Sequence, residues 1–371
     1  MKAFLAVKSL SPNYGGPAFS VSGLALALAE AGVEIGLWTS DESVLRSPLS
    51  PAHPAVRRLH GAVGDALARF GRPDLVHDNG IWLPHNHRLA SLAASCGLPR
   101  LVSTRGMLEP WAVEHKRLKK KLAWWLYQRL DLCRASYHHT TAESEAENLR
   151  LLKLGVPIGV IPNGINVVEV DSRRRRPSEF RHALFLGRIH PVKGLALLLD
   201  AWAKVRPPGW RLLLAGPDEG GHRAELEKKI AAMSLVELVH FLGPLQGEAK
   251  ERVYADADLF VLPSFSESFG MGVGEALAHG LPVLTTTGVP WPMLASCDCG
   301  WRVPITVDGI VDGLRAATSL APGALRVMGG RGRELVRREF SWPNVAKRFI
   351  DTYQALLMRR TRCKQNSSGE G

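Results

Sequence analysis

The chain has 371 residues, more than one ordinary domain holds, so its length favours two domains. Apolar residues make up 46% of it and charged residues 22%, which excludes a chain too polar to bury a sizeable core. Its 47 Lys and Arg against 35 Asp and Glu give a formal net charge of +12. Such a charge favours anionic partners, whether phosphates, nucleic acid or an anionic lipid surface.

Several features predict a cytoplasmic protein. No apolar stretch reaches the roughly 18 residues typical of a membrane span. Residues 1–16 lack the hydrophobic region and small-residue cleavage site of a signal peptide, so they predict a first strand. The five cysteines are scattered and odd in number, which fits a reducing compartment. Cys297 and Cys299 are too close for zinc-site spacing and have no second pair, so we expect no metal there.

Strand-like and helix-like segments alternate along the first half, which predicts βαβ units and a parallel sheet. A helix is predicted near residues 18–31 and ends at Gly32. The turn sequence 162–164 closes the last strand of this half. We therefore expect a first Rossmann-like domain over residues 1–165. Its predicted strands are 2–7, 34–39, 75–77, 100–103 and 156–161.

The second half restarts the same pattern and predicts a second Rossmann-like domain over residues 166–340. A run of four arginines, 173–176, is expected to be a solvated linker. A helix at 341–358 is expected to pack back on the first domain, and the polar tail 359–371 is predicted to be disordered. The predicted strands of this half are 183–186, 211–215, 239–242, 259–262 and 282–285.

The sequence LFLGRIHPVKG, residues 184–194, places two cations between a strand and a helix. Arg188 and Lys193 flank the loop before that helix begins near Gly194. Cations are electrostatically misplaced at a helix N-terminus, because the helix dipole is already positive there. A phosphate at the helix N-terminus, completed by Arg and Lys, explains both residues. Two solvated surface cations are the alternative.

The sequence LPSFSESFGMGVGEALAHGLPV, residues 262–283, combines two carboxylates with a glycine-rich helix start. Glu267 lies in the loop and Glu275 two turns along the helix. Gly270, Gly272 and Gly274 crowd its first turns, at about 1 kcal/mol each relative to alanine in a helix interior. Such glycines suit a site that a ligand or another backbone approaches closely. Each carboxylate can accept two hydrogen bonds from a sugar diol. The alternative is a capping Glu and a solvated Glu.

Together these motifs carry a family resemblance. The pattern G-R-x4-K-G at 187–194, followed by E-x7-E at 267–275 with S-F-G-M between, resembles the retaining GT-B glycosyltransferases of family 4. The resemblance extends to IPNGI at 161–165, FLGPL at 241–245 and the FSW sequence before the last helix. It implies an α/β protein of two Rossmann-like domains that face each other across a cleft.

The resemblance also implies roles for residues of the second half. Arg188 and Lys193 would hold the donor diphosphate and stabilise it as a leaving group. Glu267 would contact hydroxyls of the transferred sugar near the reacting carbon, and Glu275 would hold the ribose. Sugar or phosphate oxygens would bind the backbone N–H groups of Phe269, Gly270 and Met271, and the backbone near Leu245 would bracket the base. Such enzymes need no metal and no separate cofactor, because cations and helix termini stabilise the charge.

In the first half, candidate residues follow the predicted strands. By resemblance, the loop containing Gly15 and Gly16 would face the donor phosphates; a plain strand-to-helix turn is the alternative. His77 and Asn79 end a strand, where ligands bind in open α/β sheets, although His77 also fits a buried structural histidine. Arg105 stands near the position where many relatives carry a functional His, and we consider it a candidate for an acceptor phosphate.

Residues 115–132, HKRLKKKLAWWLYQRLDL, form a basic amphipathic pattern. The border positions hold Trp124 and Tyr127. Interfacial aromatics beside a basic apolar helix are typical of contact with an anionic membrane surface. A domain helix with its stripe in the core is the alternative. One helical stripe contains Leu118, Leu122, Trp125, Leu126 and Leu130. The cations around it are Lys116, Arg117, Lys119, Lys120, Lys121 and Arg129.

These observations predict a retaining glycosyltransferase that moves a hexose-type sugar from a UDP or GDP donor to a glycan acceptor. The acceptor is expected to be lipid-linked, in bacterial lipopolysaccharide, O-antigen or exopolysaccharide biosynthesis. The protein is expected to be peripheral on the cytoplasmic face of the inner membrane. No nucleic-acid partner is expected, since no binding module or stacking motif is present. The alternatives are a non-transferring GT-B enzyme, such as a nucleotide-sugar epimerase, and a non-catalytic nucleotide-sugar-binding protein.

Overall fold

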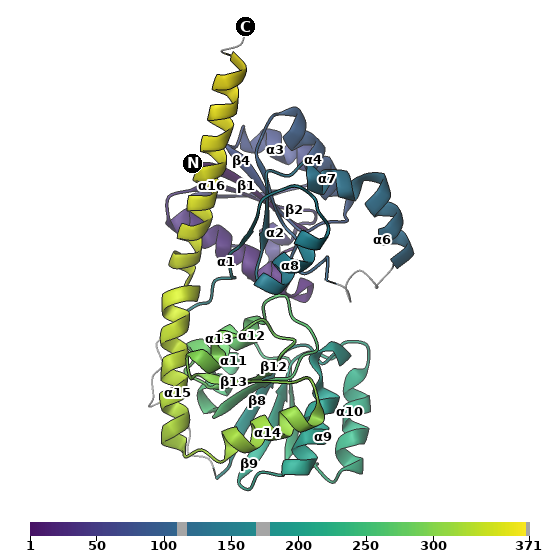
Figure 1. Ribbon diagram of the computed structural model, residues 1–371, viewed down its shortest axis with the longest axis vertical. Helices are drawn as coiled ribbons and strands as arrows, with labels where there is room; N and C mark the ends of the chain where they lie inside the picture. The colour runs from purple at the N-terminus through teal and green to yellow at the C-terminus, as the bar shows by residue number, and fades with distance from the viewer. Residues whose placement is uncertain (110–116, 168–178, 369–371) are drawn as a thin grey trace. The chain divides into compact units, whose positions relative to one another are not determined.

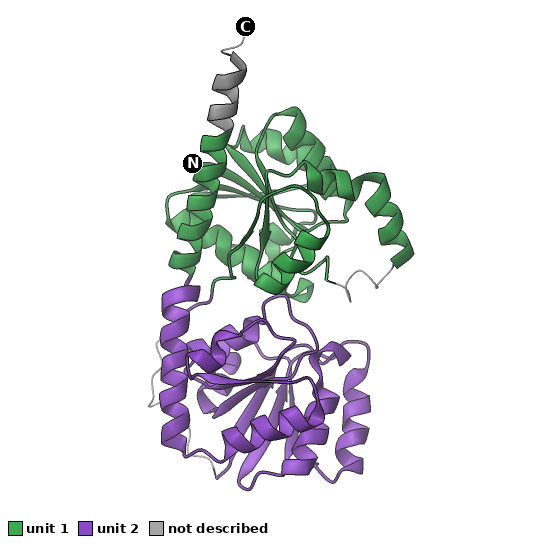
Figure 2. Cartoon of the chain, in the orientation of Figure 1, with its two compact units in different colours: residues 1–164, 342–371 green, residues 165–341 purple. Residues whose placement is uncertain are grey.

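The computed structural model describes residues 1–109, 117–167 and 179–368, with side chains of the last helix described to Arg359. The chain forms two compact units (Figure 2). Unit 1 comprises residues 1–164 and 342–371, and unit 2 comprises residues 165–341. The four-arginine run, 173–176, lies outside the described residues. Both units are α/β folds around one parallel sheet, which confirms the predicted fold class.

Unit 1 contains a seven-stranded sheet in the order β3-β2-β1-β4-β5-β6-β7 (Figure 1). Its strands are β1 (Lys2–Val7), β2 (Glu34–Thr39), β3 (Val56–His60), β4 (Leu75–Asn79), β5 (Arg100–Ser103), β6 (Tyr137–Thr140) and β7 (Ile158–Val160). Its α-helices are α1 (Gly16–Glu30), α2 (Ser43–Arg46), α3 (Val63–Phe70), α4 (Pro84–Ser95), α6 (Arg117–Ala123), α7 (Arg129–Cys133), α8 (Glu143–Leu151) and α16 (Trp342–Ser368). A short 3-10 helix, η1 (Pro12–Tyr14), and a π-helical turn, η2 (Trp124–Gln128), complete it.

Unit 2 contains a six-stranded sheet in the order β10-β9-β8-β11-β12-β13. Its strands are β8 (Arg181–Leu186), β9 (Trp210–Ala215), β10 (Val239–Gly243), β11 (Leu259–Leu262), β12 (Val283–Thr286) and β13 (Gly300–Val303). Its α-helices are α9 (Leu195–Val205), α10 (His222–Ala232), α11 (Gly247–Asp256), α12 (Met271–Ala278), α13 (Met293–Ser296), α14 (Val307–Thr318) and α15 (Pro322–Leu335). A 3-10 turn, η4 (Pro191–Lys193), and a π-helical turn, η5 (Val336–Phe340), complete it.

The strand order reverses at one point in each sheet. In unit 1 the first strand, β1, has β2 on one side and β4 on the other. In unit 2 the first strand, β8, likewise lies between β9 and β11. The loops after the two strands that flank the reversal run apart to opposite faces, and ligands of open α/β sheets bind in the crevice between them. In unit 2, the loops after β8 and β11 are therefore the expected position of a ligand site.

All ten predicted strands are present, and residues 1–109, 117–167 and 179–368 contain three further strands that were not predicted. The missed strands β3 and β13 lie at sheet edges, where exposed positions carry arginines and interrupt the apolar pattern. The interior strand β6 has the sequence YHHT, whose two histidines are buried. A search for apolar runs passes over such a strand, because its side chains are hidden although they are polar.

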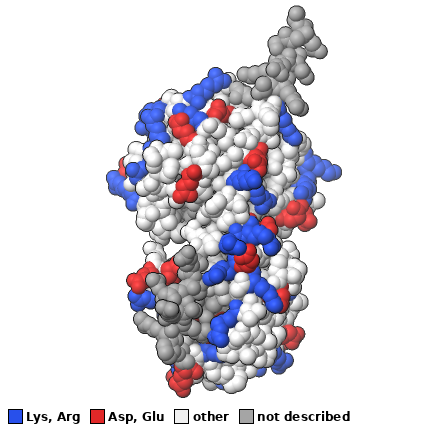
Figure 3. Space-filling view, turned by 90° about the vertical axis from the view of Figure 1, so that its left-hand side faces the viewer, with Lys and Arg blue, Asp and Glu red and all other residues white. Residues whose placement is uncertain are grey.

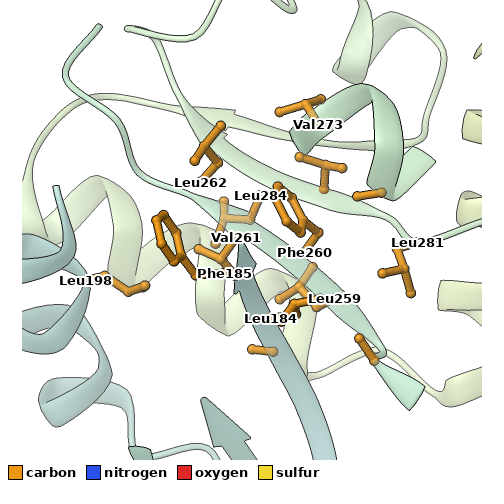
Figure 4. Packing of buried hydrophobic residues seen from close by; sticks show 14 of the residues in the cluster. Leu184, Phe185, Leu198, Leu259, Phe260, Val261, Leu262, Val273, Leu281 and Leu284 are labelled. Carbon is orange, nitrogen blue, oxygen red and sulfur yellow. The ribbon is translucent and has the colours of Figure 1, made fainter. Parts of the chain in front are cut away.

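The core of unit 2 is built on its two central strands. Apolar side chains of β8 and β11 pack against those of β12 and α12 (Figure 4). Phe185 and Phe260 are fully buried among them. Strands that are covered by helices on both faces have near-continuous apolar sequences, which is why these segments were readily predicted.

The last helix, α16, packs on unit 1, although 177 residues of unit 2 separate it from that unit in sequence. Val345, Phe349, Tyr353 and Leu356 are buried in the same cluster as side chains of α1 and the sheet. Their spacing of three or four residues places them on one face of a helix. Figure 1 shows α16 running beside α1.

The end of the chain differs from its prediction as a disordered tail. Helix α16 continues past Arg359 to Ser368, and residues 369–371 lie outside the described part. The sequence RRTRCKQ at 359–365 contains no Gly or Pro and several good helix formers. A helix that is already nucleated by packing propagates easily through such residues. The prediction of disorder relied on the low hydrophobicity of this segment and did not take its helix propensity into account.

A buried chain of hydrogen bonds ties α16 to the sheet of unit 1. His77 Nδ1 lies 2.6 Å from the Tyr353 hydroxyl, and His77 Nε2 lies 2.7 Å from Ser103 Oγ. Ser103 Oγ lies 2.6 Å from His139 Nδ1, and His139 Nε2 lies 2.7 Å from the carbonyl oxygen of Ile161. The carbonyl oxygen of Ile161 can only accept, so His139 Nε2 donates to it. Ser103 Oγ then donates to His139 Nδ1 and accepts from His77 Nε2, and the Tyr353 hydroxyl donates to His77 Nδ1. Both histidines are therefore neutral Nε2–H tautomers.

Burial enforces that neutrality. Desolvation lowers the pKa of His139 to about 3 and holds the pKa of His77 well below its ordinary value. It also lowers the pKa values of His138 and His85 to about 4. Burial acts oppositely on Asp78, whose pKa rises to about 7. As the pH falls from about 6.5 to 4, the four histidines gain protons in the unfolded chain, whereas in the folded chain Asp78 gains one. Unfolding therefore takes up protons on balance in this range.

We predict that unit 1 loses stability between about pH 6.5 and pH 4, because unfolding takes up protons there. Each neutral buried histidine contributes up to about 1.4 kcal/mol of lost stability per pH unit below an unfolded pKa of about 6.5. Calorimetric melting across this range should show the transition of unit 1 falling steeply. His77→Gln should flatten its slope, and His60→Gln, at a partly exposed site on β3, should not. A transition independent of pH would contradict the neutral chain.

Candidate functional site

The loop after β8 holds Lys193 close to the loop after β11. Gly194 ends the turn η4 with φ +67°, a conformation that favours glycine. A Cβ at Gly194 would lie 2.1 Å from the carbonyl oxygen of Pro263, so the two loops touch through their backbones. The amide of Phe265 also donates to the carbonyl of Val192 at 2.8 Å. Glycine at position 194 is thus required by the close approach of two loops of the protein itself.

Lys193 and Glu267 meet across these loops. Lys193 Nζ lies 2.5 Å from Glu267 Oε1, and both side chains are mostly buried, with 14% and 13% exposed. Ser264 Oγ donates to the same carboxylate oxygen at 2.7 Å. The backbone of Glu267 is held by its amide, which donates to the carbonyl of Gly288 at 3.0 Å. Two predicted site residues, 74 positions apart, therefore form one partly buried pair at the strand reversal.

Arg188 is on the same loop but points to a different partner. Its Nη1 lies 2.5 Å from Glu219 Oε2, and both side chains are about half exposed. The amide of Glu219 donates to the carbonyl of Ile189, which anchors this partner beside the loop. Glu219 was not predicted from the sequence, since it follows β9 and carries no motif of its own. An exposed pair of this kind contributes roughly 0–1 kcal/mol, so a ligand can displace Glu219 at little cost.

Glu275 lies on α12 in a network of its own. Its Oε1 lies 2.7 Å from Lys250 Nζ, and its Oε2 accepts from the Tyr254 hydroxyl at 3.0 Å. The Tyr254 ring stacks on His279 with centroids 4.4 Å apart. His279 in turn bonds Glu251 at 2.7 Å. Lys250 and Tyr254 on α11 were not predicted, although their spacing of four residues places both on one helix face.

The carboxylate of Glu275 keeps capacity for a ligand. A carboxylate has about four acceptor positions, and the described partners of Glu275 use one position on each oxygen. The side chains of Glu275 and Lys250 are about a quarter exposed. Glu275 is therefore oriented from one side and open on the other.

Two of the three glycines at the start of α12 are explained by packing within the protein and not by the approach of a ligand. Gly270 caps the helix with φ +80°, and the helix begins at Met271. A Cβ on Gly272 would lie 3.0 Å from Phe260, and one on Gly274 would lie 2.6 Å from Ile165. Both glycines thus permit close packing within unit 2. Gly270 and Met271 lie at the helix start, and their role in ligand binding stays a prediction.

Phe269 serves the core through its side chain. The ring is buried and packs on Trp291, whose Nε1 donates to the Phe269 carbonyl at 2.7 Å. Only its backbone N–H fits the predicted role. Leu245 follows β10 at the same edge of the sheet and packs partly on the core of unit 2. In unit 1, Gly15 (φ +80°) caps α1, which begins at Gly16, so these two glycines form the end of a strand-to-helix turn.

The first-half candidates separate into a structural residue and a polar cluster. His77 is fully buried with both ring nitrogens bonded, which favours a structural histidine over an acceptor ligand. Arg105 donates through Nη2 to Asn79 Oδ1 at 2.7 Å and through Nη1 to Asn163 Oδ1 at 2.8 Å. Asn79 ends β4 and Asn163 follows β7, so the cluster lies at the carboxyl edge of this sheet.

The basic amphipathic pattern predicted at 115–132 falls on α6, η2 and α7, residues 117–133, and exposes its apolar stripe; residues 115 and 116 lie outside the described part. Figure 1 shows α6 reaching out from the body of the unit. Trp124 and Gln128 turn inward, and Gln128 accepts from the Trp82 amide at 2.7 Å. The alternative, in which the stripe packs in the core, is therefore not seen in the described part of unit 1. The exposed fractions are 83% for Leu118, 62% for Leu122, 75% for Trp125, 70% for Leu126 and 51% for Leu130.

The exposed charges of this segment are one-sided. Residues 117–130 contain five cations and no Asp or Glu, and the acidic residue that follows, Asp131, is buried. On the face of the molecule in Figure 3, by contrast, basic and acidic side chains are interspersed. Across the described ranges, no helix is both long enough and apolar enough to cross a membrane. In the same ranges, no three His, Cys, Asp or Glu side chains are grouped to hold a metal ion.

Comparisons with known proteins match both units. Residues 15–164 match the family described as glycosyl transferase 4-like domain, and residues 181–316 match glycosyl transferases group 1. Over 316 residues the chain is 28% identical to a GDP-mannose:cellobiosyl-diphosphopolyprenol alpha-mannosyltransferase of Xanthomonas campestris. That alignment covers 83% of this chain and 79% of the relative.

Solved structures show the same fold. A sucrose-phosphate synthase from Thermosynechococcus elongatus superposes with a TM-score of 0.81 at 22% identity, covering 97% of this chain and all of that one. The Anabaena protein HepE, in complex with UDP and glucose, superposes with a TM-score of 0.71 at 18% identity, covering 96% and 100%. The fold is GT-B. The chain is a glycosyltransferase, and it belongs to the glycosyl transferases group 1 family.

Proposed function

We propose that the protein transfers a hexose-type sugar, with retention at the anomeric carbon, from a UDP- or GDP-linked donor to a lipid-linked glycan acceptor. The setting is bacterial surface polysaccharide synthesis: lipopolysaccharide, O-antigen or exopolysaccharide. The Lys193–Glu267 pair at the strand reversal of unit 2 is the observation that carries the proposal. The Xanthomonas relative, by its name, uses GDP-mannose and a diphosphopolyprenol acceptor, and HepE was solved with UDP.

The Lys193–Glu267 pair gives the site a way to exchange partners. A diphosphate carries more negative charge than one carboxylate, so it competes well for Lys193. Once Lys193 turns to the diphosphate, the Glu267 oxygen that it held can accept hydrogen bonds from hydroxyls of the sugar. Ser264 keeps the carboxylate in place during the exchange. Substrate binding and placement of Glu267 are thereby coupled.

Arg188 and Lys193 would together stabilise the leaving diphosphate. Arg188 exchanges its exposed bond to Glu219 for a phosphate oxygen, and Glu275 accepts from the ribose hydroxyls. Cations that are in place before reaction stabilise charge as it develops and cost no reorganisation. In this proposal, no metal or separate cofactor is required. The leaving phosphate would also help to deprotonate the acceptor on the same face of the sugar.

The exposed stripe of residues 117–133 supports a peripheral position on the cytoplasmic face of the inner membrane. Apolar side chains with flanking cations bind where acyl chains meet anionic headgroups. Burying Trp125 and Leu126 in that interface would remove exposed apolar surface from water. The protein would then reach a lipid-linked acceptor at the membrane surface, where that acceptor is anchored. We propose no nucleic-acid partner.

We predict that Lys193→Met and Glu267→Gln each lower kcat/KM for donor turnover by at least about 100-fold, the usual effect of losing a preorganised electrostatic contact. A screen of UDP and GDP sugars that follows nucleoside diphosphate release, with and without lipid-linked acceptors, measures this. Lys204→Met is the matched control, because it breaks an exposed Lys–Asp pair of the same unit.

Each outcome of this screen is decisive. Full activity of either site variant would refute the site. Donor conversion without acceptor would indicate an epimerase, and binding without release would indicate a non-catalytic protein. Met and Gln preserve the size of the side chains they replace, so we expect both variants to fold. Their melting temperatures check this.

We predict that the protein binds vesicles containing phosphatidylglycerol and not vesicles of phosphatidylcholine alone. Replacing Lys119, Lys120 and Lys121 with Glu should weaken this binding roughly 100-fold or more, since each cation near an anionic surface is worth about 1 kcal/mol. Trp125→Ser should weaken it as well, because the indole is exposed in unit 1. Sedimentation with vesicles measures both effects.

Leu151→Ser is the matched control for the apolar stripe. Leu151 is as exposed as Trp125 but lies on α8, outside the segment. Binding by the Leu151 variant should equal that of the unaltered protein. Equal binding by all variants would contradict a membrane role of residues 117–133.

A further inference from the structure

Arg105 occupies an unusual backbone conformation in unit 1. Its φ is +52°, in the left-handed region that residues other than Gly rarely adopt. Gly106 follows with φ +73°, so the chain turns sharply directly after β5. A bulky residue in this region is held there by its surroundings, and such positions cluster at functional sites.

Glu145 holds the backbone turn at Arg105 in place through hydrogen bonds. The carboxylate is buried, and its Oε1 accepts from Thr104 Oγ1 at 2.7 Å and from the Gly106 amide at 2.6 Å. These donors belong to the residues on either side of Arg105. Its Oε2 accepts from the amide and hydroxyl of Thr141 at 2.9 and 3.2 Å. The bonds to Thr104 and Gly106 therefore fix the turn on both sides of Arg105, and Glu145 acts on the guanidinium through its charge, without a hydrogen bond to it.

The guanidinium of Arg105 is held only by neutral groups. Its two described partners are the side-chain oxygens of Asn79 and Asn163. No carboxylate in the described part of the chain lies within ion-pairing distance of it, and its buried Nε has no hydrogen-bond partner there. Of the five N–H donors of arginine, two are used and three stay available.

Apart from Glu145, whose charge favours the cationic form of Arg105, the groups that interact with Arg105 in the described part of the chain are neutral. His77, His139, Tyr14 and Tyr353 all interact with it electrostatically. Burial lowers the pKa values of the two histidines and raises those of the two tyrosines, so all four are neutral near pH 7. Burial also lowers the pKa of Arg105 to about 10, which leaves it cationic.

A partly buried cation whose hydrogen-bond partners are neutral and whose donors are partly unused is unfavourable for folding, and a strained backbone adds to that cost. An anionic ligand group in contact with the guanidinium offsets this cost, and the planar guanidinium fork suits phosphate and carboxylate alike. We propose that Arg105 forms an oxyanion subsite at the carboxyl edge of the unit 1 sheet, which takes a phosphate or carboxylate group of the sugar acceptor. Asn79 and Asn163 are its positioning residues.

Assignment of this oxyanion to the acceptor rests on the proposed transferase reaction, in which Arg188 and Lys193 hold the donor diphosphate. Inorganic pyrophosphate is the probe, measured by titration calorimetry on the full chain. The background is Arg188→Gln/Lys193→Met, which removes the donor-side cations. In this background we expect one pyrophosphate site, which Arg105→Gln weakens at least tenfold and Arg105→Lys weakens less.

Lys153→Gln is the matched control, since Lys153 is an exposed cation of unit 1 that also has positive φ, at +49°. It should leave pyrophosphate binding unchanged. Equal affinity with and without Arg105 would overturn the proposal, and Arg105→Lys keeps the test valid if the Gln variant fails to fold. Binding of UDP or GDP much tighter than that of pyrophosphate, and dependent on Arg105, would also overturn it, because the subsite would then recognise the donor nucleotide.

Further titrations identify the source of the oxyanion. Glucose 1-phosphate and glucuronate represent a phosphorylated and a carboxylated acceptor, and we expect at least one to bind in a manner that depends on Arg105. Binding of neither would overturn the assignment to a sugar acceptor. If the Arg188→Gln/Lys193→Met background still binds UDP and GDP at full affinity, the proposed donor site fails while the Arg105 result stands.

Discussion

The reversal of strand order between β8 and β11 is the constraint on which the donor site depends. It separates the loops that leave these strands, and the backbone contacts at Gly194 and Phe265 bring the two loops back together. Only that contact allows Lys193, next to one helix start, to reach Glu267, next to another. An ion pair between distant parts of the sequence is thus a consequence of sheet topology.

The proposed donor site is balanced in charge before any ligand binds. Arg188, Lys193 and Glu275 each have an oppositely charged partner, in pairs that range from half exposed to mostly buried. Ligand binding in such a site exchanges partners, which costs less than burying new charge. Unit 1 differs at Arg105, where the hydrogen-bond partners of the cation are neutral. The two sheets therefore offer their carboxyl edges to different chemistry.

Sequence reasoning reached the fold because central strands such as β8 and β11 are apolar on both faces. It missed β6, whose buried histidines are polar, and the helical continuation of α16, whose residues are polar but helix-forming. For the proposed donor site it pointed to the charged residues next to glycine motifs, and the structure brings two of them, Lys193 and Glu267, into contact. It could not find Glu219, Lys250 or Glu145, since each acts through a contact between segments that only the folded chain brings together.

The most direct test of the donor site is a crystal structure of the protein with UDP or GDP bound. The account predicts a diphosphate in contact with Arg188 and Lys193, a ribose whose hydroxyls donate to Glu275, and a Lys193 that no longer contacts Glu267. A nucleotide bound elsewhere, with the Lys193–Glu267 pair intact, would contradict it.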